Sequence, residues 1–518
     1  MHQFVRTAAF LSLLAASAAA YAGDLEDGQA LQKDGQFEKA LPKFQAAAKA
    51  DPADPAAALG LSQVLTGLGR YDEAAKAVDA ARKAHPTNAS LLAAKGRAYF
   101  MAMIKAEAAE EPDGNFISGC HDDALRWGKE AMKADQKNVE ALLLLGLIHQ
   151  KDNNQDQAKM FFEQAANADP KNFDAAFELG NYWFLRARDD KKNMELWSSA
   201  EQGFLAALRI DPKSARAAAN VAHCKAWQNA PGKDVGAAYI RAWLLAPSDA
   251  TLLDRAFTRT PAADRVAVFQ KLCDENASNV TARRYLAFAH MGAKDHKKAL
   301  EILDAASKLD PKDPWVPLNE GEVTLDEGKK LDDAVEFLVE ALTLFKTKGA
   351  ITDDAALRIG GTIAFQNTKL SEAQREKLWT ALWKLFPERS DASNNAGLWY
   401  RDVGKDYKKS LEWYLRAVKA APEDCCIQND TGLIYHYHLD DLEKAEPYYR
   451  RAVEIGKEKG YDCNAGNDPD RGFRDAINNL YKILSKQKRW GDLKKFVEHD
   501  VPESHPLREV WLKEAEQQ

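Results

Sequence analysis

A period of 34 residues constrains this chain more than any other feature of its sequence. A glycine, two alanines and a proline recur at that spacing: Gly35, Ala40, Ala47 and Pro52, then Gly69, Ala74, Ala81 and Pro86. A fixed period of this size is typical of repeat arrays, in which each helical pair buries its apolar face only by stacking on its neighbours. Because the core of such an array grows with the number of repeats, a length of 518 residues does not require several globular domains.

Small and large apolar residues follow a fixed order within each period. Helices that cross closely need small residues at the crossing and large ones beside it, and a proline ends the second helix. Later periods repeat this set: Ala158, Phe162, Ala165 and Pro170; Ala200, Phe204, Ala207 and Pro212; Ala299, Leu303, Ala306 and Pro311; Tyr414, Ala417 and Pro422. The preceding helices carry a glycine at Gly96, Gly146, Gly180, Gly321, Gly397 and Gly432. The pattern predicts helix pairs over most of the chain.

This arrangement of small residues, aromatic residues and closing prolines resembles the tetratricopeptide repeat (TPR) family. The resemblance covers most of residues 24–500 and implies an all-α, right-handed superhelical solenoid of helix-turn-helix repeats. It also implies a non-enzymatic protein-binding role. The motifs of metalloproteases, serine hydrolases, nucleotide-binding loops and haem attachment are absent from the sequence, so we predict no catalytic residue and no cofactor.

Interruptions of the period divide the chain into segments. The predicted order is a signal peptide at 1–22, an array at 23–248 with insertions near 100–123 and 186–193, a degenerate repeat at 249–279, repeats at 280–349, a degenerate helical repeat at 350–389, an array at 390–500, and a capping helix or tail at 501–518. An exposed end of an array needs a polar cap of this kind.

The N-terminus has the pattern of a secretory signal. Arg6 precedes an apolar run over 8–20, and Ala20-Tyr21-Ala22 matches a small-residue cleavage signature. The run is shorter than the ~20 residues that span a bilayer, so we expect no membrane span after cleavage. Because the short, Ala-rich signal looks bacterial, we expect the mature protein in the periplasm or cell envelope. The net charge of −7, without a basic stripe, argues against a nucleic-acid binder.

Polar residues recur at one position of the first helix. With the small residue counted as eighth in its unit, the sixth position forms what we call the polar ladder: Asn220, Asn319, Asn395, Asp430 and Asn479. The N-terminal units instead have Gly60, Ala94, Leu144 and Glu178 there. In the family that the chain resembles, the first helices line the concave surface, so these groups could grip a peptide backbone. The alternative is that each asparagine satisfies a neighbouring helix.

Further candidates for partner binding lie beside the ladder. They are arginines and aromatic residues of the kind that anchor interfaces: Arg283, Arg284, Arg401, His436 and Tyr437. Two short clusters, at 120–123 and 436–440, contain His and Asp, but neither has zinc-ligand spacing, and no metal site is predicted. Among the six cysteines, Cys463 is expected to bridge to Cys426 or its neighbour Cys425, across a loop that could close the distance.

These observations predict a scaffold that holds an extended polypeptide segment in the groove of a TPR superhelix, with a protein or peptide partner. The alternative is an assembly or export factor for envelope polysaccharide or outer-membrane components. In that case tryptophans such as Trp183, Trp315, Trp399 and Trp413 would stack on sugar rings. The sixth position holds Asn or Asp only in the C-terminal units, where we expect the partner.

Overall fold

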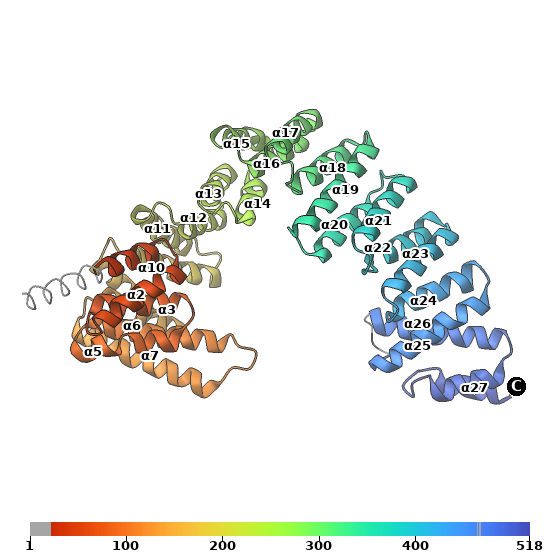
Figure 1. The fold of residues 1–518 in the computed structure, drawn as a ribbon, viewed down its shortest axis with the longest axis horizontal. Helices are drawn as coiled ribbons and strands as arrows, with labels where there is room; N and C mark the ends of the chain where they lie inside the picture. Colours follow the sequence, from red (N-terminus) through yellow and green to blue (C-terminus); the bar gives the residue numbers. More distant parts are fainter. Residues whose placement is uncertain (1–21, 464, 466–467, 518) are drawn as a thin grey trace, which may run out of the picture. The chain divides into compact units, whose positions relative to one another are not determined.

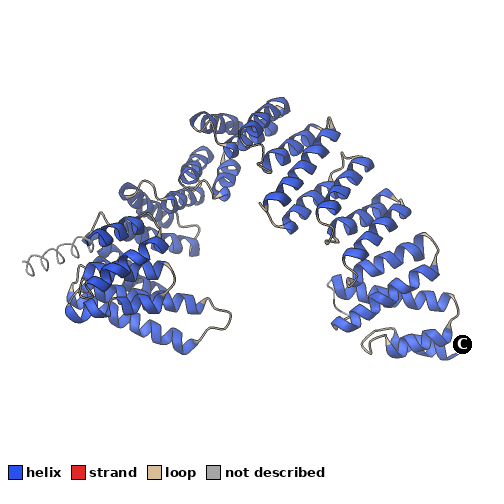
Figure 2. Ribbon diagram, viewed as in Figure 1, coloured by secondary structure: helices blue, strands red, loops and turns tan. Residues whose placement is uncertain are grey.

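The structure is a computed structural model that describes residues 22–463, 465 and 468–517. The predicted signal peptide lies almost entirely outside the described residues. Within them the chain is helical and has no strand (Figure 2). The chain divides into two compact units, unit 1 (Met1–Pro261) and unit 2 (Ala262–Gln518). The boundary falls inside the segment 249–279, between two helices of the predicted degenerate repeat.

Unit 1 is a series of helix pairs (Figure 1). Its helices are α2 (Phe37–Ala50), α3 (Pro55–Gly67), α4 (Tyr71–Ala77), α5 (Asp79–Ala84), α6 (Ala89–Glu107), α7 (Gly114–Ala134), α8 (Val139–Lys151), α9 (Gln155–Ala168), α10 (Phe173–Asp189), α11 (Met194–Ile210), α12 (Ala215–Trp227), α13 (Gly232–Leu245) and α14 (Ala250–Arg259). The first helices of the repeats are the helical residues 22–33, which precede α2, and α3, α6, α8, α10, α12 and α14. The predicted insertions lengthen the pairs α6/α7 and α10/α11.

Unit 2 continues the same alternation of first and second helices. Its elements are α15 (Ala262–Glu275), α16 (Val280–Gly292), α17 (His296–Leu309), α18 (Trp315–Glu327), α19 (Leu331–Lys348), α20 (Asp353–Gln366), α21 (Glu372–Leu385), α22 (Asp391–Trp399), η1 (Tyr400–Gly404), α23 (Tyr407–Ala420), α24 (Cys425–Leu433), η2 (Ile434–His438), α25 (Leu442–Lys459), α26 (Asp468–Lys486), α27 (Trp490–His499) and α28 (Arg508–Gln517). Here η1 and η2 are π-helical turns. The first helices are α16, α18, α20, α22, α24 and α26.

The periodic residues form the core of both units. Ala158, Phe162 and Ala165 are completely buried on α9. The glycines allow the large side chains to approach the first helices, because a Cβ added at Gly146 would lie 2.7 Å from Phe162 and one at Gly432 would lie 2.8 Å from Tyr449. Polar caps start the helices: Asn88, for example, accepts a hydrogen bond from the backbone N–H of Leu91 at 3.1 Å, a contact worth about 1 kcal/mol.

The segment 350–389 lacks the repeat signature but still forms a helix pair, α20 and α21. Arg375 of α21 is buried and donates to the carbonyls of Ala364, Phe365 and Asn367 at the C-terminal end of α20. These bonds satisfy carbonyls that a helix end leaves without partners. An arginine cap thus ties α21 to the C-terminal end of α20.

The C-terminal segment ends the array with α28. Trp511 is buried and stacks on Tyr481 of α26 at a ring distance of 4.1 Å, and the Tyr481 hydroxyl donates to Glu514. This helix covers the apolar end of unit 2, as a terminal repeat requires.

Candidate functional site: the first helices of unit 2

Two successive first helices of unit 2 end in π-helical turns, a rare element that is frequent at functional sites. Turn η1 extends α22 and turn η2 extends α24. Lys405 (φ 55°), which follows η1 directly, and Asp440 (φ 52°), which lies two residues beyond the end of η2, have a left-handed backbone. The turns carry two of the predicted site residues, Arg401 and Tyr437, to one hollow in the surface.

This hollow, the η hollow, has a volume of about 610 Å³. Its lining comes from η1, α24, η2, α26 and the segment before and within α28: Arg401, Asn429, Asp430, Leu433, Tyr437, Asp475, Asn478, Asn479, Tyr481, Lys482, Leu507 and Trp511. Tyr437 and Leu507 remain 48% and 43% exposed, so the hollow is open and has apolar as well as polar walls. Four of the predicted residues meet here: Arg401, Asp430, Tyr437 and Asn479.

Hydrogen bonds connect the polar groups of the η hollow. Asn479 donates from Nδ2 to Asn429 Oδ1 at 3.1 Å and accepts at Oδ1 from the Tyr437 hydroxyl at 2.9 Å. The Tyr437 oxygen in turn accepts from Lys482 Nζ at 3.0 Å. Asn479 is 7% exposed, so its amide serves the contact between α24, η2 and α26.

Asp430 lies at the other end of this hydrogen-bond network. Its carboxylate accepts from Arg401 and from the Tyr414 hydroxyl, each at 3.2 Å, and from Asn429 at 3.4 Å. Burial raises the pKa of Asp430, against the opposing effect of the Arg401 charge. Burial alone would lower the pKa of Arg401, but hydrogen bonding to Asp402 and the charge of Asp430 raise it overall. The carboxylate is therefore shared by several donors rather than exposed to a partner.

Asn478 supplies an uncommitted group in the η hollow. It is partly exposed, and its amide has no hydrogen-bond partner among residues 22–463, 465 and 468–517. It precedes the ladder residue Asn479 by one position, so the side chains point in different directions from α26. The sequence prediction selected Asn479 and missed Asn478, whose environment is visible only in the structure.

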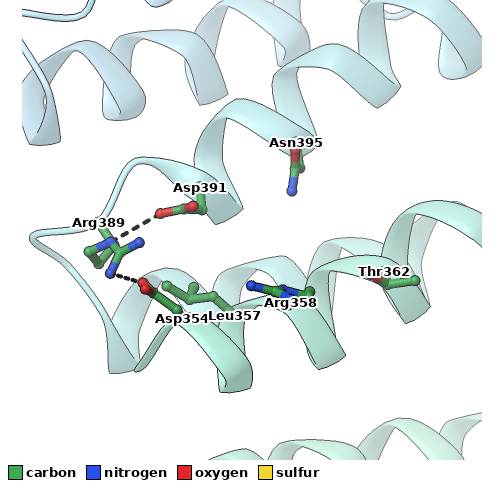
Figure 3. A pocket seen from close by; sticks show the side chains of 7 residues that line it. All are labelled: Asp354, Leu357, Arg358, Thr362, Arg389, Asp391 and Asn395. Atoms are coloured by element: carbon green, nitrogen blue, oxygen red, sulfur yellow. Dashed lines mark hydrogen bonds and ion pairs between the residues drawn. The ribbon is translucent and has the colours of Figure 1, made fainter. Parts of the chain in front are cut away.

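A second hollow, the α20/α22 hollow, has a volume of about 380 Å³ and is shown in Figure 3. It is lined by Asp354, Leu357, Arg358, Thr362, Arg389, Asp391 and Asn395. Arg389 is bonded to Asp354 and to Asp391, the latter at 3.1 Å. Asn395 projects from α22 toward the helix that carries Arg358 (Figure 3). In the described part of the chain, neither Arg358 nor Asn395 has a hydrogen-bond or ion-pair partner, so both can bind a ligand.

Arg358 occupies the ladder position of the degenerate repeat. A Cβ on Gly360 would lie 2.9 Å from Leu382 of the paired helix α21, as one on Gly321 would from Leu338 of α19. Gly360 is therefore the eighth residue of its unit, and Arg358 is the sixth. The sequence prediction missed it because no phase was assigned to this repeat. The glycine pair 360–361 is the signal that identifies the phase.

Other predicted residues lie apart from the two hollows. Asn319 of α18 is 2% exposed. It accepts from Arg284 Nε at 2.7 Å and donates to Glu322 at 3.0 Å, so its amide links α16 to α18. Arg283 donates to the carbonyl of Ala277 at 2.7 Å, in the loop before its own helix. Asn220 is on α12 of unit 1.

His436 lies in the core rather than on the surface. It is 7% exposed, lies against Tyr449, whose hydroxyl is 3.4 Å from His436 Nδ1, and burial lowers its pKa. The nearby His438 stacks on Tyr407 at a ring distance of 3.9 Å. The two side chains thus point to different neighbours, as expected for residues two apart.

All six cysteines are reduced in the structure, so the expected bridge of Cys463 to Cys426 or Cys425 is not formed there. Cys463 Sγ lies 3.9 Å from Ser504 Oγ, and the Cys425 thiol donates to the Pro469 carbonyl at 3.2 Å. Cys426 faces α26, because a Cβ on Gly472 would be 2.6 Å from its sulfur. Cys463 therefore lies against Ser504 and is not bridged to either of the other two cysteines.

The tryptophans named for sugar stacking do not offer open ring faces. Trp413 and Trp399 are 1% and 8% exposed. Lys159 lies over the Trp183 ring at 5.3 Å, and Arg284 lies over the Trp315 ring at 5.2 Å. No helix in the described ranges has both the length and the apolar character needed to span a bilayer.

Profiles described as tetratricopeptide repeat match residues 25–89 and 63–111, and again 139–172 and 431–457. No curated protein sequence matches the chain. Solved structures with a related fold include a thermophilic TPR protein of Thermus thermophilus (21% identity, covering 39% of this chain and 98% of that one, TM-score 0.34). They also include YrrB, a TPR protein with an unusual peptide-binding site (17% identity, 41% and 96%, TM-score 0.27), and yeast Tom70 (13%, 96% and 95%, TM-score 0.24).

These TM-scores are below 0.5, too low to carry information on the partner of this chain. The assignment rests on the repeat profiles, whose matches lie in both units and coincide with helix pairs of the structure. Arrays of this kind are typically non-enzymatic and bind other proteins. The chain contains tetratricopeptide repeats and has an all-α solenoid fold, which supports a scaffold for protein interactions.

Proposed function

We propose that the chain is a non-enzymatic scaffold that holds an extended polypeptide segment along the first helices of unit 2. The observation that carries the proposal is the presence of uncommitted polar groups in two neighbouring hollows, Asn395 and Arg358 in one and Asn478 in the other. An amide can donate to a backbone carbonyl and accept from a backbone N–H, whatever the side chains of the bound segment.

The charges of both hollows favour a backbone ligand over a strongly charged one. Arg358 and Arg389 stand with Asp354 and Asp391 in the α20/α22 hollow, and Arg401 and Lys482 stand with Asp430 and Asp475 in the η hollow. Positive and negative groups balance in each, which leaves hydrogen bonding and the apolar walls formed by Leu433, Tyr437 and Leu507 to provide affinity.

Arg401 connects the two hollows along the chain. Asn395 and Arg401 are six residues apart on the continuous helix formed by α22 and η1, about 9 Å along the axis. An extended segment covers that distance with about three residues. A single segment can therefore contact both hollows. We place the protein in the bacterial periplasm or cell envelope on the strength of its N-terminal sequence pattern.

The test is binding of a labelled, mixed-sequence peptide of about twelve residues to the full chain, measured by fluorescence anisotropy. The same peptide with its sequence scrambled should bind equally well, whereas a version with methylated backbone nitrogens should bind at least about tenfold more weakly, because the N–H donors are lost. The double variant Asn395→Ala, Asn478→Ala should lose affinity by a similar factor.

Gln366→Ala is the matched control, since it removes an exposed amide of α20 that lines neither hollow. Equal binding of the methylated and unmethylated peptides would refute a backbone grip. Equal losses in the control and in the double variant would refute the location.

A further inference from the structure

Arg255 of α14, in unit 1, is held by neutral groups. Its guanidinium is hydrogen-bonded to His223 Nε2 of α12, and its charge lies close to the Tyr239 hydroxyl of α13. Arg70, an exposed arginine of the same unit, is by contrast paired with Glu73 at 2.6 Å. Within the part of the chain that the structure describes, Arg255 has no such ion pair, although its side chain is exposed.

His223 can hold Arg255 because it stays neutral. Burial, and after it the charge of Arg255, lowers the pKa of His223 to about 4. At neutral pH the imidazole therefore accepts a hydrogen bond from the guanidinium at Nε2 and carries its own proton on Nδ1. Two ring contacts fix its position: Tyr239 lies 5.5 Å and Phe184 6.4 Å from it, measured between ring centroids. The result is a positioned arginine whose charge is not neutralised.

Two more uncommitted donors belong to the same elements. Asn220, the ladder residue of unit 1, is three positions before His223 on α12, and Arg259 is four positions after Arg255 on α14. Residues at these spacings share a helix face. Neither Asn220 nor Arg259 has a hydrogen-bond or ion-pair partner within the described ranges, 22–463, 465 and 468–517.

We infer that Arg255, Arg259 and Asn220 form a binding site in unit 1 for the carboxylate side chains of an acidic polypeptide. A guanidinium binds a carboxylate through two parallel hydrogen bonds, and an amide N–H can donate to a neighbouring carbonyl or carboxylate oxygen. His223 and Tyr239 are positioning residues that hold Arg255 without competing for its charge. The site is separate from the hollows of unit 2.

A polypeptide suits this site better than a free anion. One exposed ion pair contributes only about 0–1 kcal/mol, so a single small carboxylate on an open surface is weakly bound. A chain with several acidic side chains engages both arginines at once, and each further contact becomes intramolecular. The acidic residues of a partner segment therefore supply the counter-ions that Arg255 and Arg259 lack.

The experiment compares a labelled oligoglutamate peptide with an oligoglutamine peptide of equal length, each titrated into the full chain at low and at raised salt. We expect at least about tenfold tighter binding of the glutamate peptide at low salt, and a loss of that preference in Arg255→Gln. Arg70→Gln is the matched control, because it removes one charge of unit 1 from an arginine that has its own carboxylate. It should change the affinity less than about twofold.

A second variant tests the positioning role. His223→Gln keeps a hydrogen-bond acceptor beside Arg255 and should preserve most of the preference for glutamate, whereas His223→Phe should reduce it. Helix content and thermal unfolding of each variant report whether unit 1 is still folded. Equal binding of the two peptides, or equal losses in Arg255→Gln and Arg70→Gln, would overturn the inference. Binding of inorganic phosphate without binding of oligoglutamate would make this a site for free anions and overturn it too.

Discussion

Unit 1 and unit 2 use the sixth position of their first helices in different ways. In unit 1, Leu144 is completely buried at this position, and the Phe44 ring lies so close to Gly60 that a Cβ there would be 2.1 Å from it. In unit 2, Asn319 and Asn479 are nearly as buried but bond to neighbouring helices. At these residues the position packs one element against the next, through apolar contact at Leu144 and Gly60 and through hydrogen bonds at Asn319 and Asn479.

Replacing a buried apolar residue at this position of unit 1 with asparagine should have the largest effect on stability. Leu144→Asn removes a fully buried apolar side chain and places an amide among apolar neighbours without partners. The two losses together should destabilise unit 1 by about 4 kcal/mol. Amide hydrogen exchange in α6 and α8 measures this locally, which matters because an array need not unfold in one step. Gln164→Asn, an exposed change on α9, should leave exchange unaltered, and similar exchange in both variants would contradict the comparison.

The opposite replacement, of asparagine by leucine in unit 2, should change stability by different amounts at different ladder residues. Asn479→Leu leaves Asn429 and Tyr437 without their shared partner and should cost about 2 kcal/mol. Asn395→Leu removes an amide without such bonds and should change stability by less than about 0.5 kcal/mol. Urea unfolding combined with hydrogen exchange in α22 and α26 measures both. If the two variants were equally stable, the bonds of Asn479 would contribute nothing.

This difference also explains what the sequence could reveal. The period and its small residues predicted the helix pairs because burial of Ala158, Phe162 and their equivalents requires that spacing. The environment of each ladder amide could not be predicted, since Asn319 and Asn395 have the same phase but only Asn319 accepts a hydrogen bond from an arginine of the preceding first helix. Their environments depend on which residues the neighbouring repeat presents.

The π turns had a sequence signal that is recognisable only afterwards. Gly397 and Gly432 are 35 residues apart, one more than the period. The extra residue is absorbed in a wider helical turn, as π turns do, and that turn carries Arg401 into the η hollow. An insertion of one residue could equally have lengthened a loop, so the spacing alone did not predict the turn.

Lowering the pH should change the stability of the two units in opposite directions. In unit 2, burial first, and then the charges of Glu340 and Asp304, raises the pKa of Glu320 to about 7 from its usual 4.5. The folded state then binds a proton that the unfolded state has lost, so this contribution to stability is present below pH 4.5 and disappears as the pH rises through 7. Glu320→Gln should therefore stabilise unit 2 at pH 8, by on the order of 1 kcal/mol after allowance for solvent screening.

Hydrogen exchange in α18 and α19 at pH 5 and pH 8 measures this effect, after correction for the intrinsic pH dependence of exchange. Glu322→Gln on the same helix is a useful comparison, because burial raises its pKa as well but Asn319 donates to its carboxylate and opposes the shift. A wild-type unit 2 that was as stable at pH 8 as at pH 5, with no gain from Glu320→Gln, would contradict the raised pKa.

His223 is the corresponding titratable group in unit 1. Its effect on the pH dependence of stability has the opposite sign and is the smallest that we expect. Because its pKa is lowered to about 4 from 6.5, the unfolded state binds a proton between these values that the folded state does not. Its contribution to stability is therefore present above pH 6.5 and is lost as the pH falls toward 4. We expect the loss to be under about 1 kcal/mol, since the ring is only partly buried.

His223→Gln should remove this loss of stability from α12 and α14, as measured by hydrogen exchange at pH 7 and pH 5. An unchanged pH dependence in the variant would mean that His223 is not held neutral, and the arrangement around Arg255 would then lack its neutral acceptor.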